Sequence, residues 1–197
     1  MSKSNLTQSK INSEVQRLLE KYDCNYKFHE VRAAFMGAIA SPYVVDPVFE
    51  LNALWDGEFP ELDSTQAIDE VRQIFLEDFW NLLAEHADEA ADRPFELTSL
   101  AAPATLTELK AQAQLRGEEL DAFMDAFYQD QENVELSDEV AESVDIIEEL
   151  IGMCSELMNM DPDTSLSPDE LKELAGNMNK MRDMAEIELN NIILSCA

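Results

Sequence analysis

Apolar side chains recur every three or four residues along most of this chain, which is the spacing of one face of an α-helix. In the first half, the recurrence predicts helices over about residues 6–22, 27–40, 47–54 and 64–89. In the second half, it predicts helices over about residues 105–115, 120–127, 137–160 and 167–195. Strand-like alternation never persists for more than a few residues, so the expected fold is an all-α helical bundle of about 7–8 helices.

The stretch over residues 33–60, AAFMGAIASPYVVDPVFELNALWDGEFP, organises the rest of the chain. An apolar helix ends before Pro42 and a short helix starts at Pro47, because proline lacks a backbone donor and disfavours helix in the residue before it. Gly37 and its neighbouring alanines have little or no side chain. They predict that another helix packs closely here.

A few residues mark where helices begin, end or turn inward. Ser137, which two acids follow, and Ser167, which a proline follows, have the composition of helix N-termini. The span 64–89 has the widest apolar stripe and is expected to be the central helix, with Ile68 among its inward residues. Gly117 is expected to break the helical pattern around it.

The chain is long enough for one domain or for two small subdomains that share a core. We expect an N-terminal helical subdomain over residues 1–97 and an acidic C-terminal helical subdomain over residues 98–197, packed as a single unit. Phe95 and Leu97 are expected to return to the core. Residues 98–106, which contain a proline and several small residues, are the expected hinge.

Charge is the strongest feature of the composition, because 13 basic and 42 acidic residues give a net charge of −29. Residues 1–32 hold 6 basic and 4 acidic residues, whereas residues 117–171 hold 18 acids and no Lys or Arg. Such a surface repels nucleic acids and anionic membranes, and it attracts basic partners at a rate that falls with salt. We therefore expect no direct nucleic-acid binding. The acidic surface is either only solubilising or a site for a basic protein.

The residue types needed for common chemistry do not fall in usable patterns. His29 and His86 lack a Glu three residues earlier, so neither matches a di-metal bundle, and no Cys/His set fits zinc. The loop after Asp161 lacks the glycine and the twelfth-position acid of a calcium site. There is no glycine-rich phosphate loop and no nucleophile elbow. We expect no catalytic residues, no metal and no cofactor.

The sulfur-containing residues predict reduced thiols, and the methionines allow two interpretations. Three cysteines, an odd number at distant positions, predict free thiols: Cys24, Cys154 and Cys196. Methionines of the second half fall at helical spacing, which predicts core positions, and an adaptable binding groove is the alternative. They are Met153, Met158, Met160, Met178, Met181 and Met184. With no apolar run of ~18–20 residues and no signal peptide in the sequence, the expected compartment is the cytoplasm.

Residues 28–98 resemble the YecA/YgfB-like family of bacterial proteins. The resemblance is carried by FMGAIASPYVVDPVFELNALW, then DGEFPELDSTQAIDEV, and then an aromatic long helix and RPFELT. It implies an all-α bundle of two packed helical subdomains in a cytoplasmic protein with a regulatory or interaction role, and it supplies no catalytic residues. Some members of the family carry a Cys-rich zinc tail, which the end of this chain, IILSCA, lacks.

Four functions are open at this point. The first is a non-enzymatic interaction module that binds a basic protein through an acidic face, namely Glu139, Glu142, Asp145, Glu148 and Glu149. The second is a DNA mimic that occupies a DNA-binding protein. The third is a small-ligand binder or enzyme with a pocket near residues 41–56, lined by Tyr43, Asp46, Trp55 and Asp56. The fourth is an assembly subunit that dimerises through an apolar helix face.

Overall fold

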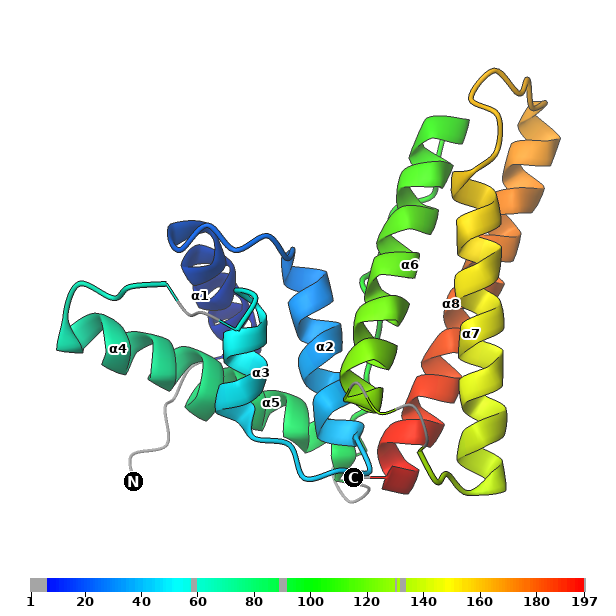
Figure 1. The fold of residues 1–197 in the computed structure, drawn as a ribbon. Helices are drawn as coiled ribbons and strands as arrows, with labels where there is room; N and C mark the ends of the chain where they lie inside the picture. Colours follow the sequence, from blue (N-terminus) through cyan, green and yellow to red (C-terminus); the bar gives the residue numbers. More distant parts are fainter. Residues whose placement is uncertain (1–6, 58–59, 89–91, 130, 132–133, 197) are drawn as a thin grey trace.

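The computed structural model describes residues 7–57, 60–88, 92–129, 131 and 134–196. Within these ranges it contains seven helical segments and no β-strand, which confirms the all-α prediction (Figure 1). Six segments are single helices: α1 (Gln8–Lys21), α2 (Phe28–Ala40), α3 (Pro47–Ala53), α6 (Leu106–Tyr128), α7 (Asp138–Met158) and α8 (Pro168–Cys196). The seventh is composite: α4 (Thr65–Val71), η1 (Arg72–Phe79), α5 (Trp80–Ala84) and η2 (Glu85–Ala87).

The composite helix departs from α geometry in its middle, where η1 is a π-helix and the Trp80 amide donates to the Phe75 carbonyl, five residues back. One row of its buried residues recurs at steps of four: Ala67, Val71, Phe75, Phe79 and Leu83. Four residues of an α-helix turn about 40° more than one full turn, and the wider π-turn cancels that drift. Ile68 lies outside this row and is 51% exposed, so the expectation that it faces inward is wrong.

Helices α2 and α6 occupy the centre of the fold, which corrects the expectation of a central helix over residues 64–89. The most extensive helix–helix contact joins these two helices. A Cβ atom added to Gly37 would lie 2.9 Å from the carbonyl carbon of Phe123 and closer still to its oxygen. The two backbones therefore touch at this crossing, as the small residues around Gly37 predict.

Helix α6 runs through Gly117 without a break, so the prediction of two separate helices here is wrong. A glycine inside a helix costs about 1 kcal/mol relative to alanine. Burial of apolar residues on both sides of the glycine outweighs this cost: Leu109, Ala113, Leu120, Phe123 and Phe127. Thr105 caps the helix, because its side chain accepts a hydrogen bond from the Glu108 amide at 3.2 Å.

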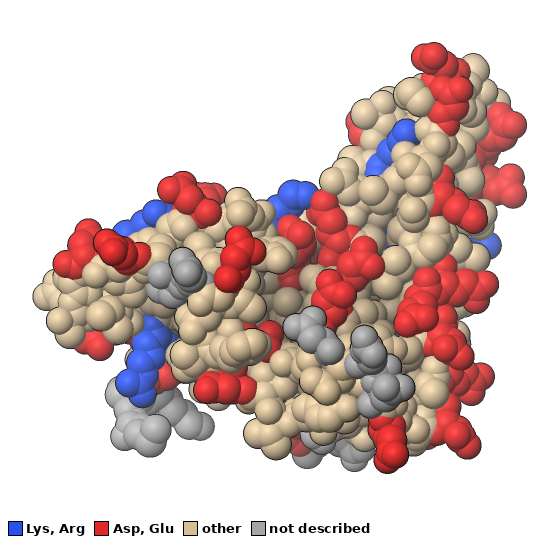
Figure 2. Space-filling model, viewed as in Figure 1, with Lys and Arg blue, Asp and Glu red and all other residues tan. Residues whose placement is uncertain are grey.

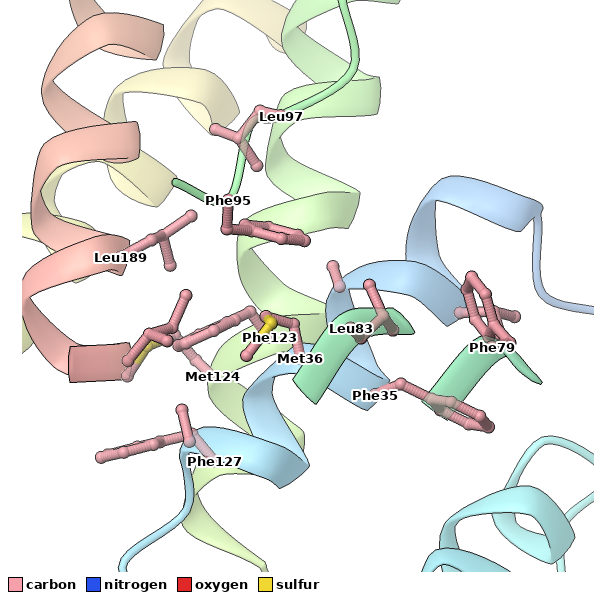
Figure 3. Close-up of a cluster of buried hydrophobic side chains, with 14 of the residues drawn as sticks. Phe35, Met36, Phe79, Leu83, Phe95, Leu97, Phe123, Met124, Phe127 and Leu189 are labelled. Carbon is pink, nitrogen blue, oxygen red and sulfur yellow. The ribbon is translucent and has the colours of Figure 1, made fainter. Parts of the chain in front are cut away.

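One apolar core joins residues from both halves of the chain (Figure 3). It combines Phe35 of α2, Phe123 of α6 and Leu189 of α8 with side chains of α1, η1 and α7. Phe95 and Leu97 are buried in the same core, as predicted. The division into two subdomains stays a prediction.

The extended segment 94–98 is held by side chains instead of a neighbouring strand. The Phe95 amide donates to Asn190 Oδ1 at 2.7 Å, and Asn190 Nδ2 donates back to the Phe95 carbonyl at 2.9 Å. Farther along the segment, the Leu97 amide donates to Glu186 and the Thr98 amide donates to Glu119, each at 3.0 Å. Because buried backbone groups need partners, these bonds allow a strand-like segment to cross a helical core.

The ends of α6, α7 and α8 that lie farthest from α2 extend past the rest of the molecule (Figure 1). The apolar cluster of this region is small, with only Leu109, Ala113 and Met178 buried among the described residues. Lys110 Nζ donates to the Met160 carbonyl at 2.7 Å, beside the end of α7. This region therefore leaves more of its apolar surface near solvent than the main core does.

Candidate functional site

The acidic face of α7, which is the candidate site from the sequence, consists of exposed carboxylates: Glu139, Glu142, Asp145, Glu148 and Glu149. The opposite side of the helix is buried against α6 and α8 by Val140, Val144, Ile147, Leu150 and Cys154. Ser137 starts the helix as predicted, since its Oγ accepts a hydrogen bond from the Val140 amide at 3.3 Å. Burial of one side thus turns the five carboxylates toward solvent.

The carboxylates of this acidic face are not neutralised by any described basic residue of the chain. Among the described residues, no Lys, Arg or His forms an ion pair with any of the five. The N-terminal half differs, because there Glu70 pairs with both Arg17 and Lys21. Like charges three and four residues apart on one helix repel one another. A cationic partner would relieve that repulsion.

One neighbour of the acidic face, Tyr128, shows how it affects nearby groups. The hydroxyl of Tyr128 donates to Glu148 Oε1 at 3.5 Å. Burial, followed by the charge of Glu148, raises the pKa of Tyr128 above its usual value. Figure 2 shows Asp and Glu along the outer edge of the region that α7 occupies in Figure 1, with few Lys or Arg beside them. On the view shown, acidic side chains therefore recur along this edge, with uncharged surface between them.

A second candidate site is a cavity of about 330 Å³ between α2, α3 and α6. Small residues and carboxylates line it, with two aromatic rings at its edge: Ala34, Ala53, Ala122, Glu30, Glu50, Asp125, Tyr26 and Phe49. Glu50 is largely buried and accepts a hydrogen bond from Gln129 Nε2 at 2.9 Å. The cavity is anionic and partly aromatic, so its walls suit a cationic group better than an anion.

This cavity lies beside the expected pocket at residues 41–56, but none of the four residues named from the sequence lines it. Asp46 caps α3, with its Oδ1 accepting from the Val48 amide at 2.9 Å. Trp55 is half-buried, and its indole N–H donates to the Tyr22 carbonyl at 2.9 Å. Tyr43 and Asp56 are exposed. Asp46 and Trp55 thus have roles in holding α3, and the pocket expected from the four residues stays a prediction.

A cluster that sequence spacing does not reveal joins the start of α2 to α6. His29 Nε2 lies 2.9 Å from Glu118 Oε2, and Lys27 Nζ lies 2.8 Å from the same carboxylate. Glu30 belongs to the cluster, and one ligand atom from each of His29, Glu30 and Glu118 falls within 4.8 Å of the others. Burial opposes ionisation of Glu118, but hydrogen bonds from Lys27, Gln114 and His29 outweigh it and lower its pKa. Because Lys27 already neutralises Glu118, the cluster is better explained as a tie between helices than as a cation site.

Comparison with protein-family models, with curated proteins and with solved structures gives no match to this chain. The resemblance to the YecA/YgfB-like family therefore stays a prediction. Within the described ranges, no helix combines the length and apolarity needed to cross a bilayer.

Proposed function

We propose that this chain is a non-enzymatic interaction protein that binds a basic protein partner through the acidic face of α7. The observation that supports the proposal is the contrast between the acidic face of α7 and the other helices. The ion pairs of the described residues gather at the N-terminal half and around α6 and α8, whereas the acidic face takes part in none. An anionic surface of this kind accelerates encounter with a cationic protein and depends on ionic strength.

The test is affinity capture from the source cell at about 50 mM and about 500 mM salt, because high salt screens exposed charges over a few ångströms. The bait is the full chain, compared with a variant in which the acidic face is reversed by Asp145→Lys, Glu148→Lys and Glu149→Lys. A basic protein should be retained at low salt, released at high salt, and lost with the variant.

A matched control reverses three exposed acids elsewhere: Glu20→Lys, Glu61→Lys and Asp69→Lys. It changes the net charge by the same amount and should keep the partner. If the control releases the partner as fully as the α7 variant does, binding depends on total charge and not on this face. Binding that ignores both salt and the α7 reversal would overturn the proposal.

The same bait and variants distinguish the proposed function from two alternative functions. A DNA mimic would place its carboxylates in the groove of a DNA-binding protein, so its captured partner would be displaced by duplex DNA. A small-ligand binder would use the cavity between α2, α3 and α6, whose acidic and aromatic lining favours a cationic ligand. Its ligand would be lost with Phe49→Ala and kept with the α7 reversal.

The proposed compartment is the cytoplasm, where three unpaired thiols stay reduced. In that setting the chain acts by occupying its partner's basic surface. No group of the described residues is assigned a catalytic role.

A further inference from the structure

A groove of about 830 Å³ runs between α7 and α8, in the region that extends past the rest of the molecule. The residues from α7 that line it include Ile146, Leu150, Met153 and Leu157, and Met160 follows just after the end of the helix. Those from α8 include Leu174, Met181 and Met184. The groove is therefore mostly apolar, and we call it the α7–α8 groove.

The lining residues fall at the spacing that a third helix needs. On α7 they are separated by four, three and four residues, and on α8 by seven and three. These are the steps of a heptad, in which apolar side chains of one helix enter gaps between side chains of its neighbours. Two such rows side by side form an acceptor for one more helix with a single apolar stripe.

Without a partner, the α7–α8 groove is open to solvent. Met153 is 43% exposed and Met184 is 47% exposed, whereas Met178, on the inner side of α8, is buried. Met178 is thus buried, as the core interpretation predicts, whereas Met153, Met160, Met181 and Met184 line the groove. Methionine is flexible and polarisable, so a groove lined by it adapts to the shape of an inserted helix.

Charge at the edges of the groove indicates which helix fits. Glu149 and Glu156 line it on the α7 side, and residues 117–171 contain no Lys or Arg. Lys180 lines it on the α8 side. A second copy of this chain is a poor occupant, since each copy carries a net charge of −29 and would repel the other.

We propose that the α7–α8 groove binds an amphipathic helix of a basic protein, with its apolar stripe on the methionines and its lysines or arginines beside Glu149 and Glu156. The inference rests on the proposed function and adds the form in which the partner is recognised. The apolar contact supplies salt-resistant affinity, and the α7 carboxylates supply orientation and rate. The partner's side that faces Lys180 carries neutral or acidic residues.

The probe is a designed peptide of about 21 residues, which is three heptads. It has leucine at the a and d positions and lysine at most others, so that the helix has one apolar stripe. Its control is a scrambled peptide of the same composition, which has the same charge and no stripe. Binding of each fluorescent peptide to the full chain is measured by anisotropy at about 50 mM and about 500 mM salt.

The variant is Met153→Asp together with Met184→Asp, and both positions are exposed enough to accept the change without loss of the fold. The matched control is Ile68→Asp, another exposed apolar residue, which lies on α4 away from the groove. The variant should weaken the striped peptide at least tenfold and leave the scrambled peptide unchanged. Ile68→Asp should change neither, and methyl NMR should show shifts at Met153 and Met184 but not at buried Met36.

Three other outcomes overturn the inference and differ in what they say of the proposed function. If both peptides bind equally and salt releases both, the acidic surface binds cations, and the groove proposal alone fails. If neither peptide binds at low salt, the proposed function fails as well. If sedimentation shows a dimer that Met153→Asp with Met184→Asp dissociates, a second copy occupies the groove instead of a partner helix.

Discussion

Gly37 lies against the carbonyl of Phe123, so closely that α2 and α6 touch through their backbones. An added methyl group would overlap backbone atoms that cannot rotate away as a side chain would. We predict that Gly37→Ala lowers the free energy of unfolding by roughly 3 kcal/mol or more, which is the upper range for overpacking a core. Urea unfolding followed by circular dichroism measures the change.

The matched control is Gly152→Ala, in the middle of α7. A Cβ atom there would meet nothing within 4 Å. Alanine is the better helix former by about 1 kcal/mol, so this change should stabilise the protein. If the two variants changed stability in the same direction, the backbone contact would not explain why residue 37 is a glycine.

A buried carboxylate at the joint between α6 and segment 94–98 gives the second prediction. Glu119 is 0% exposed, forms an ion pair with Arg116, and accepts from Thr98 Oγ1 at 2.6 Å. Arg32 lies 3.5 Å from the same carboxylate. We predict that Glu119→Gln destabilises the protein by roughly 3–5 kcal/mol, because it removes the main counter-charge of two largely buried guanidinium groups.

Glu70→Gln is the control for this effect. Glu70 also pairs with two basic residues, Arg17 and Lys21, but all three side chains are substantially exposed. Exposed pairs contribute about 0–1 kcal/mol. If Glu119→Gln lowered the free energy of unfolding no more than Glu70→Gln does, the role of burial would be contradicted. Thermal and urea unfolding of both variants provide the comparison.

Asn190 gives a third prediction, because its amide closes two hydrogen bonds with the backbone of Phe95. Asn190→Asp removes the donor and puts a charge beside a carbonyl, so it should destabilise by roughly 1–3 kcal/mol. It should also raise amide hydrogen exchange at Phe95 and Leu97. Asn179→Asp on the exposed side of α8 should do neither, and equal effects at both sites would count against the bridge.

Local sequence signals foretold much of this fold. Ser167 illustrates why, since the Glu170 amide donates to its Oγ and its own amide donates to the Glu170 carboxylate, as a capping box requires. Gly37 illustrates it again, because only the smallest residue allows a backbone crossing. Helix ends and close contacts of this kind depend on residues near in sequence or on one residue alone.

Several features that depend on distant residues were not predicted. The π-helix of η1 arises because Phe75 and Phe79 must both face α2, which helical propensity does not encode. Helix α6 continues through Gly117 because burial on both sides outweighs a local cost. The pairing of Glu118 with His29 joins positions 89 residues apart. In the candidate site, spacing placed the carboxylates of α7, but only the fold shows the groove beside them.

The last prediction concerns pH and the thiol of Cys154, which is buried between α7 and its neighbours. Burial raises the pKa of this thiol to about 11, although the nearby charge of Arg116 acts in the opposite direction. In the unfolded chain the thiol has an ordinary pKa of about 8.5. Between these two values the unfolded chain releases the proton and the folded chain keeps it, so rising pH favours unfolding. The contribution of this thiol to the free energy of unfolding is thus fully present below about pH 8. It is lost as the pH approaches about 11.

Comparison with Cys154→Ala isolates this effect, because every other titrating group is present in both proteins. At pH 7 the natural chain should be the more stable, since alanine leaves a small cavity. As the pH rises from about 8 toward about 10.5, the difference in free energy of unfolding should shrink, because only the natural chain has the thiol to ionise. Urea unfolding at several pH values measures that difference. A difference that stays constant, or grows, across this range would show that burial does not hold the thiol protonated.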